Sequence, residues 1–309
     1  MSLTCISRAA GVSAQIARNC FSQFFTNGNN HLSRFVKTSA GLDKTAKLGR
    51  AVAEMTQGIL QETGGSESAV KTAKNIVDCT KVTRDVMGLG NVVGGVIPNI
   101  ISNVRKCYSL MRQSFSARAE FDPSNKRAFH QNALYTKSDF RLAAAKTVCD
   151  LISGTTFAVT FGGLKPTLLA NKVAGNPFLS SEAKASLGTG ISILMTANHA
   201  AGVVGGGLSI IRERRAYQRC LERLNQKEVG QEESGSAQEV QAMRSSYVKR
   251  LRNIILTIIE KALELVADFL KLIPWPMSAA CNLACVGAIT TASSSLALWK
   301  VWQSTGSSS

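Results

Sequence analysis

The residues best placed to do chemistry are Asn198 and His199, a polar pair near the middle of an uncharged stretch of 27 residues. A histidine there could relay protons, because its charge changes near neutral pH. The simpler interpretation is a hydrogen bond to a facing helix, since a polar group in apolar surroundings needs a partner. The candidate partners on the preceding apolar segment are Thr155, Thr156 and Thr160. We favour the hydrogen bond over the relay.

No other residues form a recognisable catalytic or metal site, so we expect a protein that is not an enzyme and holds no cofactor. His31 and His130 have no acidic or thiol residue four positions later. Cys281 and Cys285 lie one helical turn apart, but no histidine or second cysteine pair accompanies them, as a zinc site requires. The spacing of Gly88, Gly90 and Gly94 lacks the preceding strand of a dinucleotide-binding motif. It favours close helix packing instead.

The composition favours a membrane surface over nucleic acid as the partner of the positive charge. The 309 residues include 36 Lys and Arg against 20 Asp and Glu, a net charge of +16. Hydrophobic residues make 45%, which is too many for a disordered basic tail. Aromatic residues make only 6%, few for stacking on bases. Attraction of the basic residues to an anionic lipid surface is the simpler explanation.

Four stretches without charged residues indicate membrane-crossing helices. They are residues 86–104, 151–164, 185–211 and 272–299. A helix needs about 20 residues to cross a bilayer, so the third stretch is long enough. The second reaches the lower limit when it begins at Val148, and the last is a further candidate beyond Pro276. The first contains several glycines and Pro98, which predict a turn or a broken helix.

The two central stretches predict a bilobed hydrophobic hairpin over residues 148–211, joined by a polar connector at 165–184. The apolar residues assigned to the membrane are Val148, Leu151, Phe157, Phe161, Leu164, Leu187, Ile191, Leu194, Val203, Ile210 and Ile211. The basic residues assigned to its interface are Lys165, Arg212, Arg214 and Arg215. Because Lys and Arg gather on the cytosolic side of membranes, both flanks of the hairpin are expected to face a cytosol.

The remaining segments predict amphipathic helices, so the expected fold class is all-α. Residues 41–147 form an amphipathic helical region, with one helix at 42–60 and another at 69–87 that Ser68 caps. Residues 212–240 form a basic helix and a polar linker. Residues 241–309 form an amphipathic helix at 250–273 and the C-terminal apolar helix. The 250–273 helix either lies on a membrane surface or packs in a bundle. We favour the bundle, with the charges from Glu260 to Lys271 on its solvated face.

The first 40 residues are typical of an export or targeting leader. They contain Ser, Ala and Arg, and the first acidic residue is Asp43. This pattern fits an amphipathic transit peptide, and it equally fits the uncleaved leader of a specialised bacterial secretion system. The residues alone leave both possibilities open.

Three blocks of the chain carry a resemblance to a known family. They are GLDKTAKLGRAVAEMTQGIL, FGGLKPTLLANKVAGNPFLSSEAKASLGTGISILMTANHAAGVVGGGLSI and LTIIEKALELVADFLKLIPWP. In order and spacing they resemble the chlamydial inclusion membrane proteins, which carry a bilobed hydrophobic hairpin. The first lobe of this chain is shorter than is usual in that family.

The resemblance implies type III secretion without cleavage, with the secretion machinery and a chaperone as partners. It implies insertion in the membrane of the host-cell vacuole, the inclusion, with basic helical regions exposed to the host cytosol and to an unknown host protein. It implies neither enzymatic activity nor a functional residue. The alternative is a soluble helical secreted effector with a buried glycine-rich core or transient membrane insertion. The number of membrane spans and the side of the C-terminus stay open.

Overall fold

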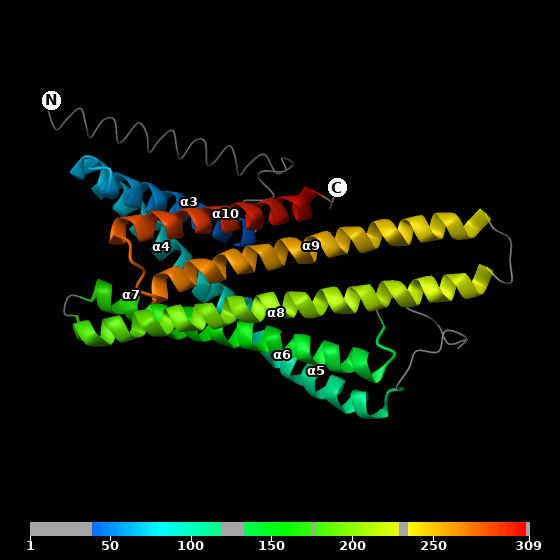
Figure 1. Cartoon of the computed structure of the whole chain (residues 1–309). Helices are drawn as coiled ribbons and strands as arrows, with labels where there is room; N and C mark the ends of the chain where they lie inside the picture. Colours follow the sequence, from blue (N-terminus) through cyan, green and yellow to red (C-terminus); the bar gives the residue numbers. More distant parts are fainter. Residues whose placement is uncertain (1–38, 119–132, 175–176, 229–233, 307–309) are drawn as a thin grey trace, which may run out of the picture.

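The computed structural model describes residues 39–118, 133–174, 177–228 and 234–306, and the elements of this part are helices (Figure 1). They are α3 (Ser39–Glu62), α4 (Glu67–Asn91), α5 (Ile97–Ser116), α6 (Lys137–Val159), α7 (Lys165–Val173), α8 (Ser181–Glu228), α9 (Ser234–Leu272) and α10 (Ala279–Gly306). Two π-helical turns are η1 (Val92–Val96) and η2 (Thr160–Leu164). The described residues contain no strand, so the predicted all-α class is confirmed. The predicted leader lies almost wholly outside the described residues.

Helices α4 and α9 begin earlier than the sequence predicts. Ser66, not Ser68, caps α4, and its hydroxyl accepts a hydrogen bond from the backbone N–H of Ala69. The helix begins earlier because the preceding turn ends at Gly64 and Gly65, and Gly64 adopts φ +70°. The predicted polar linker up to residue 240 is too long, since α9 already begins at Ser234. Its Ala, Gln and Glu residues are good helix formers.

Of the two alternatives predicted for residues 86–104, the broken helix is confirmed and the turn is wrong, because α4, η1 and α5 follow one another as one helix that the π-helical turn η1 interrupts. Pro98 lies two residues beyond η1 and cannot donate the backbone hydrogen bond that Gly94 would accept. A π-helical turn accommodates this defect without ending the helix. The same arrangement recurs at η2, where Gly162, Gly163 and Pro166 hold the corresponding positions. Helix α7 therefore occupies the first half of the predicted connector at 165–184.

The helices pack in a sequence of neighbouring pairs. Helix α3 contacts α4 and α10, α10 contacts α9, α9 contacts α8, α8 contacts α6, and α6 contacts α5. Figure 1 shows α8 and α9 as a long antiparallel pair at the centre. This arrangement places α9 between α8 and the α3–α10 pair, so three helices reach its surface.

Among the described residues, three helical segments are long and apolar enough to cross a membrane: Lys137–Lys172, Ser181–Leu224 and Ala279–Gln303. The first two contain the arms of the predicted hairpin, and the third is the predicted C-terminal apolar helix. Their most apolar windows are only 28%, 22% and 28% buried within the protein. Most of this apolar surface therefore lies on the outside of the bundle.

Helices α3 and α10 approach each other most closely at Gly58 and Gly287. A Cβ atom on Gly58 would lie 2.5 Å from the backbone nitrogen of Ala284, and one on Gly287 would lie 2.7 Å from the Cα of Met55. These neighbours are backbone atoms, which cannot rotate away. The close α3–α10 contact therefore requires residues without a side chain at positions 58 and 287.

Replacing Gly287 by alanine is expected to lower the free energy of unfolding by about 1–3 kcal/mol, because α3 and α10 must separate. Denaturation of the full chain in a neutral detergent, followed by circular dichroism, measures this change. Gly207→Ala on α8 is the matched control, since its Cβ would meet no atom within 4 Å. It should leave stability unchanged or raise it by up to about 1 kcal/mol. Equal effects of the two substitutions would contradict the close approach.

Candidate functional site

Helix α9 buries three of its acidic side chains. Glu260, Glu264 and Asp268 follow one another at intervals of four residues, so they share one helix face. Their exposed fractions are only 3%, 4% and 6%. The expectation of a solvated charged face on this helix is therefore wrong, although its expected place in a bundle is confirmed. The physical reason is that basic side chains from neighbouring helices meet this face.

The opposite face of α9 is apolar and exposed. Ile255, Ile259, Val266 and Phe269 have exposed fractions between 41% and 48%. The helix is thus inverted relative to an amphipathic helix on a water-soluble protein, where the apolar stripe packs inward.

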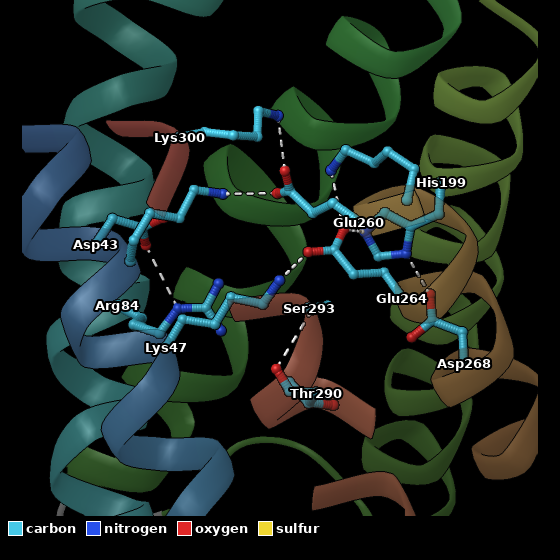
Figure 2. Close-up of polar contacts among 12 residues, drawn as sticks. Asp43, Lys47, Arg84, His199, Glu260, Glu264, Asp268, Thr290, Ser293 and Lys300 are labelled. Atoms are coloured by element: carbon cyan, nitrogen blue, oxygen red, sulfur yellow. Dashed lines mark hydrogen bonds and ion pairs between the residues drawn. The ribbon is translucent and has the colours of Figure 1, made fainter. Parts of the chain in front are cut away.

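Glu264 is the centre of the buried charged cluster in Figure 2. It forms an ion pair with Lys47 of α3 and another with Lys261, whose Nζ lies 2.9 Å from Oε2. The Nε2 atom of His199 lies 2.7 Å from the same oxygen. Glu260 similarly meets Lys44 at 3.3 Å and Lys300 at 2.9 Å. Each of these two carboxylates therefore has two lysine partners.

His199 bridges two carboxylates of α9. In addition to Glu264, its Nδ1 atom lies 2.7 Å from Oδ2 of Asp268. The predicted hydrogen bond of His199 to a facing helix is therefore confirmed, but the partners expected on the preceding segment are wrong. The corresponding prediction for Asn198 is confirmed, since its Nδ2 donates to Thr156 Oγ1 at 3.3 Å and also to the carbonyl of Ser153 at 2.7 Å. Consecutive residues lie 100° apart around a helix, so the two side chains face different neighbours.

Burial and crowding of charge shift the pKa values in this cluster. Burial by itself would raise the pKa of Glu260, but the ammonium groups of Lys44, Lys261 and Lys300 outweigh it and lower the pKa to about 2. Burial lowers the pKa of Lys261 to about 8, and the charge of Lys44 acts in the same direction. Burial also lowers the pKa of Lys47 well below its usual value. The Glu260 carboxylate is therefore stabilised in its charged form, whereas burial and neighbouring positive charges disfavour the charged forms of Lys47 and Lys261.

A cavity of about 420 Å³ adjoins this cluster. Its charged lining comes mainly from α3, α4 and α9, and includes Lys47, Arg84 and Lys261. Its apolar lining comes mainly from α6, η2, α7 and α8, and includes Phe161 and Met195. The cavity therefore has one charged wall and one apolar wall.

The basic residues that the sequence assigns to a membrane interface occupy different environments. The Nζ atom of Lys165 lies 2.9 Å from Oδ1 of Asp85 and 3.7 Å from the centre of the Phe161 ring, within the bundle. Arg214 is exposed, whereas Arg212 and Arg215 are half-buried. Arg215 also donates to the hydroxyl of Ser138 at 2.5 Å.

The residues assigned to the membrane are mostly half-buried. Val148 and Ile211 are exposed, Phe161 is buried, and the other eight are intermediate.

The sequence assignment did not include Arg219, which is buried on α8 and lies 2.6 Å from Oδ2 of Asp139. Asp139 also completes a capping box with Thr136 at the start of α6. This pairing joins α8 to α6 near the beginning of α6.

The remaining candidates do not assemble into a metal or catalytic centre in the part of the chain that the structure describes. Cys281 and Cys285 are free thiols, and no group of three His, Cys, Asp or Glu residues there could hold a metal ion. His31 and His130 lie outside the described residues. No known protein family, no characterised protein and no solved structure matches this chain.

Proposed function

We propose that this chain is a type III secreted inclusion membrane protein, anchored by the hairpin at residues 148–211, that offers basic helical regions to a host protein. The observation that carries the proposal is the inverted distribution of side chains. Charged residues of α9 and the polar pair of α8 lie inside the bundle, whereas large apolar residues lie outside. Ionisable residues of membrane proteins characteristically face the bundle interior and pair with one another.

Lipid is a better solvent than water for this surface. On α8, Ile193 and Val204 are each 55% exposed, while Asn198 and His199 are buried. On α10, Trp299 and Trp302 are exposed near one end, where an interfacial aromatic belt would place them. Soluble monomers rarely expose so many large apolar side chains.

The secretion route and the vacuole membrane rest on the resemblance of the three sequence blocks to inclusion membrane proteins. The basic segment after Ile211 supports a cytosolic side for that flank, and the exposed Arg214 lies in it. The exposed basic residues of α5, Arg105, Lys106 and Arg112, are a second surface available to a host protein. No enzymatic step is part of this proposal.

Replacing Val204 by aspartate is expected to prevent stable membrane insertion, because a carboxylate on the exposed face of a spanning helix costs up to about 2.5–3.5 kcal/mol, the value at the helix centre. Carbonate extraction of membranes from infected cells measures it: the variant moves to the supernatant. Val204→Leu is the matched control and stays in the pellet. Release of the unaltered protein by carbonate would contradict the proposal and favour a soluble effector.

Protease digestion of sealed vacuoles tests the orientation, with one cleavable tag at each end of the chain. A hairpin anchor places both tags on the host side, so both are expected to be cleaved. Protection of the C-terminal tag alone would assign α10 as a third span. Protection of both tags would contradict the proposed exposure to the host cytosol.

A further inference from the structure

We propose that the cavity between α3, α4, α8 and α9 binds an amphiphile with a phosphate head and a single apolar chain. Its volume of about 420 Å³ is within the usual range of small-molecule sites, about 300–1,000 Å³. The two walls of the cavity differ in character, and the ligand class follows from what each of them requires.

The charged wall has more cations than carboxylates. Nine Lys and Arg side chains and six Asp and Glu side chains line the cavity. Four of the carboxylates form ion pairs with four of the cations: Asp43 with Arg84, Glu54 with Arg50, Asp85 with Lys165, and Asp78 with Lys172. Among the other five lysines, Lys44 pairs with Glu260 beyond the lining, Lys47 and Lys261 share Glu264, Lys271 lies 3.7 Å from Asp268, and Lys81 is exposed. The lining still holds more cations than carboxylates.

An anion in the cavity would balance this surplus positive charge. Lys47 and Lys261 share the single carboxylate of Glu264, and a buried charge is strongly unfavourable unless it is fully paired. A phosphate monoester carries about −1.5 to −2 charges and three acceptor oxygens, so one head group can accept from several lysines at once. A phosphate therefore matches the surplus better than a singly charged carboxylate does.

The apolar wall requires a hydrocarbon partner. Phe157 and Phe161 stack with their ring centres 4.4 Å apart, and Leu168, Ile191 and Met195 continue this wall. Inorganic phosphate would leave these side chains uncovered, whereas an attached alkyl chain would bury them. The ligand is thus a phosphate amphiphile, available either as a bilayer lipid or as a soluble molecule.

Calorimetry and thermal unfolding of the purified full chain in a neutral detergent test the site with three probes: hexyl phosphate, inorganic phosphate and hexanol. Hexyl phosphate is expected to bind and to raise the Tm, because a ligand that binds only the folded state stabilises it. The other two probes should bind at least about tenfold more weakly, since inorganic phosphate can contact only the charged wall and hexanol only the apolar wall. Equal binding of inorganic phosphate, equal binding of hexanol, or no binding of hexyl phosphate would overturn the proposal.

Two pairs of variants locate the binding in this cavity. Lys81→Met removes an exposed cation of the lining, and Lys74→Met is its control, two turns earlier on α4 and outside the lining. Ile191→Trp fills the apolar wall, and Ile193→Trp is its control on the exposed side of α8. The cavity variants should weaken hexyl phosphate binding about tenfold, the effect of one lost charge-assisted contact. Unchanged binding in both would overturn the assignment.

Reconstitution distinguishes the two sources of the ligand. The full chain is placed in phosphatidylcholine vesicles with and without lysophosphatidic acid, a phosphate monoester with one acyl chain, and hexyl phosphate binding is measured in both. Loss of binding in the presence of lysophosphatidic acid assigns the site to a bilayer lipid. Unchanged binding assigns it to a soluble phosphate amphiphile. Absence of binding in both vesicle types would overturn the proposal.

Discussion

Replacing Glu264 by leucine is expected to lower the free energy of unfolding by about 3–5 kcal/mol, the cost of removing one partner from a buried ion pair. The substitution leaves Lys47 and Lys261 inside the bundle without the carboxylate that they share, and His199 loses one of its two acidic neighbours. Chemical denaturation of the full chain in neutral detergent, followed by circular dichroism, measures the loss.

Two further variants separate this effect from a general intolerance of leucine. Glu222→Leu changes an exposed glutamate of α8 and should alter stability by no more than about 0.5 kcal/mol. The triple variant Glu264→Leu, Lys47→Met, Lys261→Met removes the charges together and should recover most of the lost stability. A triple variant as unstable as Glu264→Leu would show that packing, not charge, explains the loss.

Acidification from pH 5 to pH 2 is expected to destabilise the protein, and about 3 kcal/mol of this loss should come from Glu260. Its pKa of about 2 in the folded protein lies below the ordinary value of 4.5, so the unfolded chain takes up a proton first as the pH falls. The stabilisation is present above pH 4.5 and is lost as the pH falls toward 2. Unfolding measured at several pH values gives this slope.

The Glu260→Gln variant provides the control for the acid dependence. It cannot ionise, so its stability should be lower at pH 7 and should fall less steeply between pH 4.5 and pH 2. The difference between the two curves isolates this one carboxylate from the other acidic groups. Parallel curves for the variant and the unaltered protein would contradict the assignment of the lowered pKa to Glu260.

The sequence predicted the helices well but not which side of α9 lies inside. Apolar periodicity distinguishes the face of α9 that carries Ile255 and Ile259 from the face that carries Glu260 and Glu264. It does not indicate which of these two faces points into the bundle. The orientation depends on lysines from α3 and α10, more than 150 residues away for Lys44 and Lys47. Three acidic residues at intervals of four are the signal that could have suggested an inward charged face.

The cavity was beyond sequence analysis for a related reason. His199 and Asn198 were recognisable because they interrupt an apolar stretch, and the expected threonine partner is confirmed for Asn198 alone. The cations that line the cavity, such as Arg84 and Lys81, belong to an ordinary amphipathic helix and carry no local signature. Only the packing of distant helices brings them together.

The π-helical turn η1 has a consequence for the exposed surface of the chain. Val82, Val86, Leu89 and Val93 precede or enter it at alternating steps of four and three residues, and all four are exposed. Beyond it, the same rhythm continues through exposed apolar side chains at Ile97, Ile101, Val104, Tyr108, Met111 and Phe115.

One additional residue in an unbroken α-helix would rotate everything beyond it by 100°. The wider turn of η1 accommodates that residue, so the exposed apolar side chains of α4 and α5 stay on the same side of the helix. An exposed apolar stripe with coiled-coil spacing thus runs from α4 to the end of α5. Gly94, Gly95 and Pro98 keep the two halves of this stripe on the same side of the helix.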